Sequence, residues 1–335
     1  PIKSSAASDV YKRQGMMQSV SKNPVFQRMM GVRYIVSDSD VPGYTLVKKC
    51  GTTGIYQNKD AAPVMYATDR VMTEEEYKKL AFPYNQTVLL EYAVVGGHTE
   101  SEDQNIMTAY QPVSLKKADT QDGWKIHAKK MKKTTFSIQQ VQQKTAQEKK
   151  QENRVLFLKF RVDNAHPNKD VAVWINGIRN KLSAKDHVYY NENKTFTYAV
   201  PLKDGEDTIS VTFGKGKYQL SHVQAYLGSL PERSKTLYQS EVQVDKKLTK
   251  DNVIQGTIQV KNNGWFITSI PYDTHFKMYI DGKETKIQKV NTAFLGCEIG
   301  SGKHEVRIVY HAPGATEGKV FSMIGIVGFV LLLVL

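Results

Sequence analysis

From about residue 112 onward, short runs of Val, Ile, Phe and Tyr alternate with polar breaks. Several of the breaks are Asp-Gly or Asn-Gly pairs, which suit the tight turns of antiparallel hairpins. The first residues of these pairs are Asp122, Asn176, Asp204, Asn263 and Asp281. The spacing of runs and turns is typical of antiparallel sheets stacked face to face. We therefore expect two β-sandwich-like domains, one over residues 112–229 and a smaller β module over 245–312, joined by a linker at 230–244.

The first part of the chain mixes helix and strand signals and predicts a small α/β subdomain over residues 15–111. Asn23 and Pro24 are suited to begin a short helix that ends at Gly31. Thr73 and Glu76 have the spacing of a capping box at the start of a second helix. Further predicted elements are strands at Val32–Ser37, Tyr44–Lys49, Gly54–Asn58 and Val64–Asp69, which together form a small sheet, and a helix at Asn85–Val95.

Three stretches fall outside this pattern. Residues 1–14 show no hydrophobic period and look like a translated adaptor tail, so we expect them to be non-native. The polar run Gln139–Asn153 suits either an exposed helix or a long loop. The uncharged stretch Val320–Leu335 is apolar on every helical face, but a bilayer span needs about 20 apolar residues. We expect residues 318–335 to be the start of a truncated transmembrane helix in a fragment of a longer protein; the alternative is a buried C-terminal helix.

The 335 residues carry a formal net charge of +13, which favours anionic partners. Lipid headgroups, phosphate polymers of a cell wall and nucleic acid all meet this criterion. No nucleic-acid-binding motif is present, and the lysines are spread along the chain. The expected partners are therefore the lipid bilayer and an anionic cell-wall polymer or glycolipid, with no nucleic acid.

The two cysteines, Cys50 and Cys297, lack the spacing of a zinc site or a disulfide framework. We expect small apolar packing roles for them, although a bridge between the two stays open. No metal site and no cofactor in this chain is predicted.

No sequence motif combines a nucleophile, a base and an oxyanion site, so we predict no catalytic residue. The Gly214–Lys217 run lacks the spacing of a phosphate-binding loop and suits a basic turn. Trp265, Tyr272 and His275 could bind a sugar or lie at the headgroup level, although core packing of a small sandwich is the favoured explanation of the aromatic residues. Asp281 is the most conspicuous acid, and its position before Gly282 suits a tight turn that demands a positive φ.

Several motifs of the C-terminal β module occur in a fixed order: SIPYD at 269–273, YIDGK at 279–283, NTAFLG at 291–296 and GKHEV at 302–306. Upstream, GVRYI at 31–35 precedes GIYQNKDAAP at 54–63, with Gln57 where Glu is usual. The combination resembles the C-terminal extracytoplasmic region of the YfhO family of bacterial polytopic membrane proteins. The resemblance extends from about Asn23 to Leu335.

Members of that family look like glycosyltransferases that move a sugar from a polyprenyl-phosphate carrier onto lipoteichoic acid or a related wall polymer. The resemblance implies an extracytoplasmic location, a multi-pass membrane protein and a catalytic acid in a loop upstream of this chain. The alternative is a cell-surface carbohydrate-binding or structural ectodomain with no catalytic role.

Overall fold

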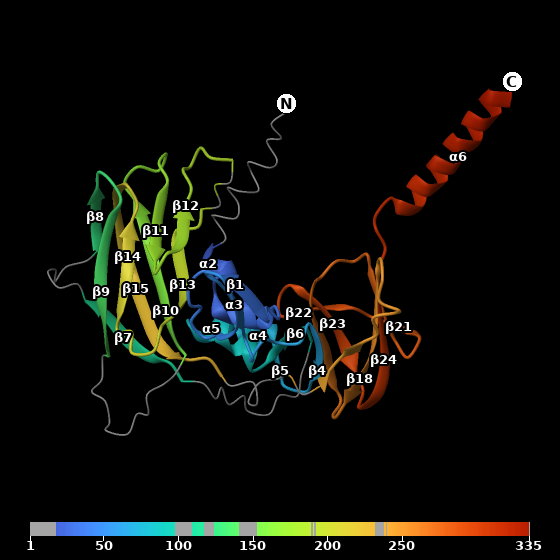
Figure 1. The fold of residues 1–335 in the computed structure, drawn as a ribbon, viewed down its shortest axis with the longest axis horizontal. Coiled ribbons are helices and arrows are strands. Elements are labelled where there is room, and N and C mark those ends of the chain that lie inside the picture. Colours follow the sequence, from blue (N-terminus) through green and yellow to red (C-terminus); the bar gives the residue numbers. More distant parts are fainter. Residues whose placement is uncertain are drawn as a thin grey trace. The chain divides into compact units, whose positions relative to one another are not determined.

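The computed structural model describes residues 18–97, 109–116, 124–140, 153–188, 190, 192–231, 238 and 240–334 (Figure 1). The fold is mainly β, with a small α/β part near the N-terminus and a C-terminal helix. The chain divides into two compact units, each assembled from separate stretches. The first, here called the barrel unit, takes residues 1–62, 80–91 and 105–235; the second, the two-sheet unit, takes 63–79, 92–104 and 236–335. The tail predicted as non-native and residues 141–152 of the ambiguous polar run lie outside the described residues.

One continuous antiparallel sheet forms the main body of the barrel unit. Its strands are β7 (Gln111–Lys116), β8 (Trp124–Ala128), β9 (Lys132–Gln140), β10 (Arg154–Asn164), β11 (Val171–Ile175), β12 (Ile178–Leu182), β13 (Thr195–Pro201), β14 (Thr208–Phe213) and β15 (Gly216–Ser229). The order is β12-β11-β14-β9-β7-β15-β10-β13, with β8 also paired to β15, and the terminal strands β12 and β13 lie close together. The result is a near-closed barrel.

The barrel corrects the sandwich that we predicted for residues 112–229, because a single sheet curls around the core where two facing sheets were expected. A bulge helps to explain the curvature. The pairing of β10 with β15 shifts between Lys159 and Arg161, and His222 of β15 has a φ of 51°. Such a bulge bends a strand and increases its twist, which favours closure of a long sheet.

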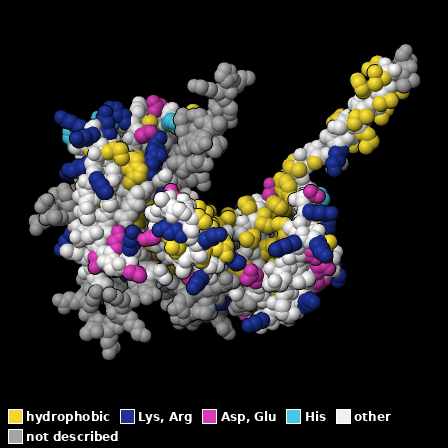
Figure 2. Space-filling model, in the orientation of Figure 1, with side chains coloured by type: hydrophobic (Ala, Val, Ile, Leu, Met, Phe, Trp, Pro, Cys, Tyr) yellow, Lys and Arg dark blue, Asp and Glu magenta, His cyan; other side chains and the backbone are white. Residues whose placement is uncertain are grey.

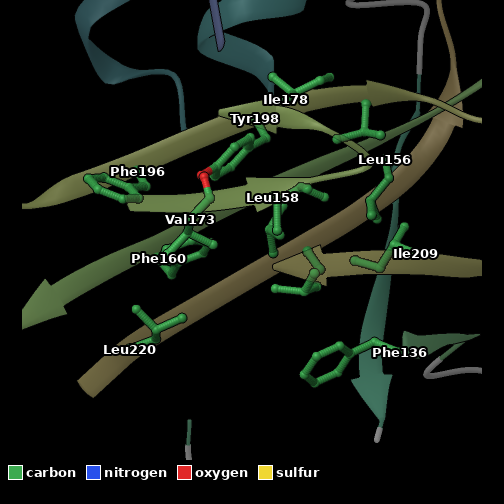
Figure 3. Packing of buried hydrophobic residues seen from close by; sticks show 14 of the residues in the cluster. Phe136, Leu156, Leu158, Phe160, Val173, Ile178, Phe196, Tyr198, Ile209 and Leu220 are labelled. Carbon is green, nitrogen blue, oxygen red and sulfur yellow. The ribbon is translucent and has the colours of Figure 1, made fainter. Parts of the chain in front are cut away.

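Alternate residues of each barrel strand point inward and form one apolar core (Figure 3). Leu156, Leu158 and Phe160 of β10 are fully buried there. The Tyr198 hydroxyl, also buried, donates a 2.9 Å hydrogen bond to the Val173 carbonyl of β11. Burial raises the pKa of this phenol well above its usual value, so the hydroxyl keeps its proton and remains a donor.

The small α/β part packs on the outer face of this barrel. It contains α2 (Gln18–Ser21), α3 (Pro24–Met29), α5 (Tyr84–Thr87), the 3-10 turn η1 (Val88–Leu90) and a sheet of β1 (Tyr34–Ser37), β3 (Thr53–Gln57) and β2 (Thr45–Cys50). Val25 and Leu90 contact a cluster with Val155 and Phe157, the outward-facing residues of β10. The helix start at Asn23 is confirmed, since its side chain accepts hydrogen bonds from Val25 N and Phe26 N.

The second unit contains two five-stranded antiparallel sheets that share one core. The first sheet has the order β16 (Ser240–Glu241), β4 (Met65–Thr68), β19 (Gly264–Pro271), β23 (Phe294–Ile299) and β22 (Gln288–Val290). The second has the order β17 (Gln243–Val244), β18 (Val253–Val260), β24 (Gly302–Tyr310), β20 (Phe276–Ile280) and β21 (Lys283–Thr285). Phe266 from the first sheet and Met278 and Ile308 from the second are buried in the shared core.

Two local predictions differ from the structure because distant strands take up the residues concerned. The strand at 64–69 does not join the small N-terminal sheet but pairs with β19 as β4. The helix predicted for Asn85–Val95 ends early: after η1, the strand β6 (Ala93–Val95) pairs in parallel with β5 (Val71–Thr73). Between β5 and β6, α4 (Glu74–Lys79) begins with the predicted capping box, in which Glu76 N donates to the Thr73 hydroxyl and Thr73 N to the Glu76 carboxylate.

The cysteines are free and differ in environment. Cys297 is buried, with its Sγ 3.3 Å from Met278 Sδ, which confirms an apolar packing role. Cys50 is exposed at the end of β2, so the packing role predicted for it is wrong.

The chain ends in α6 (Ala315–Val334), whose described apolar side chains between Val320 and Leu333 are mostly exposed. Among the residues that the structure describes, no helix has both the length and the apolar character needed to cross a bilayer. The transmembrane role of residues 318–335 stays a prediction.

Candidate functional site

Trp265 lies on the face of the first sheet that points away from the shared core. It follows Gly264 in β19, and its neighbour Phe266 points into the core, so Trp265 must point to the opposite side. Its cross-strand neighbours are Glu298 of β23 and Thr68 of β4. The residue as a whole is 7% exposed.

Beside Trp265 is a hollow of about 770 Å³, within the second unit. Its walls are Gly96, Gly97, Asn263, Gly264, Trp265, Gln288, Glu298, Ile299 and Gly300. Glu298 is exposed and forms no ion pair with a described residue. No described residue accepts a hydrogen bond from the Trp265 indole N–H, and this nitrogen is not one of the unpartnered atoms sealed from solvent. The hollow therefore offers polar groups that have no partner in the described part of the chain.

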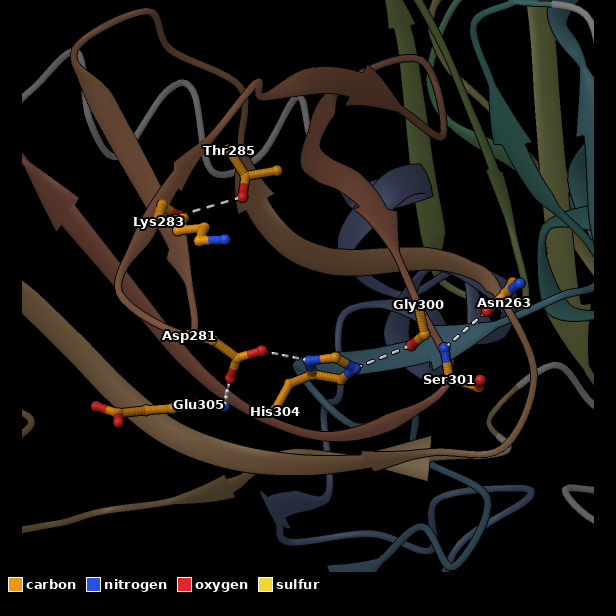
Figure 4. A network of polar contacts seen from close by, with 8 residues as sticks. All are labelled: Asn263, Asp281, Lys283, Thr285, Gly300, Ser301, His304 and Glu305. Atoms are coloured by element: carbon orange, nitrogen blue, oxygen red, sulfur yellow. Dashed lines mark hydrogen bonds and ion pairs between the residues drawn. The ribbon is translucent and has the colours of Figure 1, made fainter.

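A network of polar contacts holds the lip of this hollow (Figure 4). The Asp281 carboxylate contacts His304 Nδ1 at 2.7 Å, and His304 Nε2 contacts the Gly300 carbonyl at 3.1 Å. Both imidazole nitrogens thus contact oxygen atoms, so His304 connects the Asp281 side chain to the Gly300 carbonyl. On the other side of the turn, Ser301 N donates to Asn263 Oδ1 at 2.8 Å. Gly300 and Asn263 are thereby fixed as walls of the hollow.

Asp281 also satisfies the local requirement that we predicted for it. Asp281 and Gly282 have φ values of 51° and 77° at the β20–β21 turn, as a tight hairpin requires. The hydrogen bond from His304, together with one from Glu305 N, holds the pKa of the Asp281 carboxyl below its usual value. The carboxyl is therefore an anionic structural group at neutral pH, and its contact with His304 adds a role that the turn alone does not explain.

The other two predicted residues, Tyr272 and His275, are not among the walls of the hollow. Tyr272 packs against the shared core, with Lys289 Nζ 5.5 Å from its ring centroid. His275 is exposed, and its Nδ1 lies 2.7 Å from Asp273 Oδ1. Of the four predicted residues, Trp265 is a wall of the hollow and Asp281 belongs to the network that holds its lip.

A second feature lies at one end of the barrel, where four turns meet. The register of β15 with β8 and β10 places the β8–β9, β14–β15 and β10–β11 turns together. Lys185 N donates to the Pro167 carbonyl, which joins the β12–β13 connection to the same end. Nine exposed lysines lie in or beside these turns: Lys129, Lys130, Lys132, Lys133, Lys169, Lys185, Lys194, Lys215 and Lys217. We call this surface the basic barrel end; Figure 2 shows Lys and Arg side chains gathered over the barrel.

The basic barrel end keeps a strong excess of positive charge. Its four stretches, 129–133, 163–170, 183–194 and 214–217, contain nine lysines and only four carboxylates. Two of these carboxylates are already bound by other cations, Asp170 by Lys181 and Asp163 by Arg161. None of the nine lysines forms an ion pair with a described residue.

Sequence reasoning missed this surface because the lysines are far apart in the chain. The basic run Gly214–Lys217 was correctly predicted as a turn, between β14 and β15, and the Lys129–Lys133 run was a similar signal. Glu298 and Gln288 were also missed, since only cross-strand pairing brings them beside Trp265. Within the part of the chain that is described, no group of three or more His, Cys, Asp or Glu side chains is placed to hold a metal ion.

A family model and a curated relative of this chain both carry the name YfhO. A family model described as bacterial membrane protein YfhO matches residues 4–322. The uncharacterized protein YfhO of Bacillus subtilis (strain 168) is 20% identical over 279 residues, which make up 81% of this chain. The chain spans only 31% of the length of that relative.

Similarity to solved structures is slight. A Paenibacillus cycloisomaltooligosaccharide glucanotransferase complexed with cycloisomaltoheptaose shares 8% identity at a TM-score of 0.18, over 60% of this chain and 44% of that one. A cupin 2 conserved barrel domain protein from Leptotrichia buccalis shares 10% identity at a TM-score of 0.13, over 64% of this chain and 92% of that one. These scores are too low to support any inference.

Proposed function

Because the chain belongs to the YfhO family of bacterial membrane proteins, we propose that it forms an extracytoplasmic region that binds an anionic cell-wall polymer or glycolipid at its basic barrel end. The observation that carries this proposal is the set of nine exposed lysines without ion-pair partners in the described structure. A repeating phosphate polymer presents many charges at once, so several lysines can contact it together.

For the whole protein, the proposal is a membrane glycosyltransferase that uses a polyprenyl-phosphate-linked sugar and modifies lipoteichoic acid or a similar polymer. The motif resemblance supports this reaction, and the catalytic residues would belong to the part of the protein that this chain does not match. The exposed apolar side chains of α6 support attachment to the bilayer. In this arrangement, the basic barrel end retains the acceptor polymer near the membrane.

A second candidate function is a surface carbohydrate-binding module with no catalytic role. The hollow beside Trp265 favours it, since the hollow presents, next to an indole, polar groups without a partner among the described residues. Structural support of a membrane bundle is a further alternative and predicts no binding at either surface.

The test of the proposed function is binding of the full chain, held in detergent micelles, to soluble poly(glycerol phosphate). We expect affinity to fall by about tenfold or more between about 50 mM and 500 mM NaCl, because screening weakens contacts between exposed charges. Neutral dextran is the matched polymer without charge and should not bind the barrel end. Equal binding at low and high salt would remove the electrostatic basis of the proposal.

A further inference from the structure

We propose that the hollow beside Trp265 is a separate binding site for an uncharged pyranose sugar. It lies within the two-sheet unit and depends on none of the nine lysines of the basic barrel end. Sugar binding at the hollow can therefore be tested separately from anion binding at the basic barrel end.

The polar groups of the hollow match the hydroxyl groups of a sugar. The Trp265 indole N–H and the Gln288 amide are donors with no partner among the described residues, and Gln288 can also accept. The Glu298 carboxylate is a strong acceptor directly across the strand from Trp265. A pyranose carries several hydroxyls that both donate and accept, so it can satisfy this mixed set, while its C–H face contacts the accessible part of the indole.

The glycine residues leave room for such a ligand. A Cβ on Gly96 would lie 3.8 Å from Gln288 Oε1, so any longer side chain there would begin to cover the amide. Gly97 has a φ of +103° and open space beyond it. The volume of about 770 Å³ is within the range of small-molecule sites and exceeds the need of one monosaccharide.

Charge decides against an anionic ligand. Among the described walls of the hollow, Glu298 is the only charged residue, so a phosphate or carboxylate placed there would meet a like charge with no cation from a described wall residue. The hollow and the basic barrel end thus differ in the chemistry they recognise. One would bind the uncharged sugar part of a glycopolymer, and the other its phosphate backbone.

The ordered lip favours binding because its geometry is set before the ligand arrives. His304 fixes the Gly300 carbonyl, and Asn263 fixes Ser301 N, so two sides of the turn are held by side chains. Little conformational entropy is then lost in ordering these walls when a ligand binds.

The experiment is a ¹⁹F NMR titration of the full chain labelled with 5-fluorotryptophan. The protein contains three tryptophans, and single Trp→Phe replacements assign their signals. The probes are methyl α-D-glucopyranoside and glucose 6-phosphate, each up to about 50 mM, a range suited to weak single-sugar affinities. We expect the neutral sugar to shift the Trp265 signal in a saturable manner, with the Trp124 and Trp174 signals unchanged, and the phosphorylated sugar to bind more weakly.

Glu298→Gln should weaken the affinity for the neutral sugar by about threefold or more, because a charge-assisted hydrogen bond becomes a neutral one. Glu284→Gln is the matched control, since Glu284 pairs with Lys277 on the other sheet, and it should leave the affinity unchanged. No saturable shift of the Trp265 signal, or tighter binding of glucose 6-phosphate, would overturn the proposal. Loss of polymer binding at the basic barrel end would not change the expected binding of the neutral sugar.

Discussion

Asp281, in the turn between β20 and β21, and His304, on β24 of the same sheet, are joined at 2.7 Å between Oδ2 and Nδ1. The contact connects the β20–β21 turn to the Gly300–Gly302 turn, because the same imidazole reaches the Gly300 carbonyl. A residue required by the local φ of one turn therefore also positions the lip of the Trp265 hollow.

Asp281→Asn tests this contact through its pH dependence. The Asp281 pKa is lowered from 3.8 in the folded protein, mainly by the hydrogen bond from His304. The carboxylate therefore stabilises the fold above the unfolded pKa, and this contribution is lost as pH falls through the folded pKa. Asn tolerates the positive φ and can still accept from Glu305 N, so the turn itself is preserved.

We expect the free energy of unfolding of wild type to exceed that of Asp281→Asn near pH 5, and the difference to shrink toward zero as the pH falls below about 3.8. Chemical denaturation of both proteins across this range measures it. A difference that is independent of pH would show that the charge of Asp281 does not contribute.

Tyr198→Phe tests the polar contact inside the barrel core. The substitution removes the hydroxyl that donates to the Val173 carbonyl while keeping the ring in place. We expect a loss of about 1–2 kcal/mol in unfolding free energy. Tyr226→Phe is the control, because the Tyr226 hydroxyl makes no hydrogen bond with a described residue, and it should change stability by less than about 0.5 kcal/mol.

Gly264→Ala tests how closely β19 approaches β4 beside Trp265. A Cβ at this position would lie 2.3 Å from the Thr68 carbonyl oxygen, which is backbone and cannot rotate away. We expect destabilisation of about 1–3 kcal/mol. Gly300→Ala, at the lip, would place its Cβ 3.9 Å from Asn263 Oδ1 and should be nearly neutral. Thermal unfolding measures the stability of both variants. Equal stability of the two would contradict the register of β19 with β4.

The two cysteines should differ sharply in reactivity. Burial raises the pKa of the Cys297 thiol to about 12, so almost none of it is thiolate at neutral pH, whereas Cys50 is exposed. In the native protein, iodoacetamide should therefore modify one thiol, at Cys50, and a second only after denaturation. Peptide mapping by mass spectrometry locates the label; rapid native labelling of Cys297 would contradict the buried position of β23.

Features that depend on local sequence were predictable, and features set by distant partners were not. The Asn23 helix start and the Asp281-Gly282 turn follow from backbone requirements of a few adjacent residues. Ala93–Val95 has a pattern equally suited to helix or strand, and the choice is made by Val71–Thr73 and by Asn291 Oδ1, which accepts from Val94 N.

The hollow and the basic barrel end also combine features set by local sequence with features set by distant partners. Trp265 was identifiable as an aromatic residue in a β module, but its neighbour Glu298 became part of the hollow only through strand pairing. The closure of the barrel brings turns from four places in the chain to one end, and the bulge between Lys159 and Arg161, which helps to explain the curvature, is not revealed by composition. The basic barrel end therefore could not be read from the spread of lysines along the sequence.

Anion binding at the basic barrel end is tested by comparing two fourfold lysine variants in the poly(glycerol phosphate) binding assay. The barrel variant replaces Lys129, Lys130, Lys132 and Lys133 with Gln, and the control replaces Lys246, Lys247, Lys250 and Lys261, which are exposed in the two-sheet unit. Both lose the same charge. We expect the barrel variant to lose about tenfold or more in affinity at low salt and the control to lose less than about twofold. Equal losses in the two variants, or none in the barrel variant, would contradict a binding site at the basic barrel end.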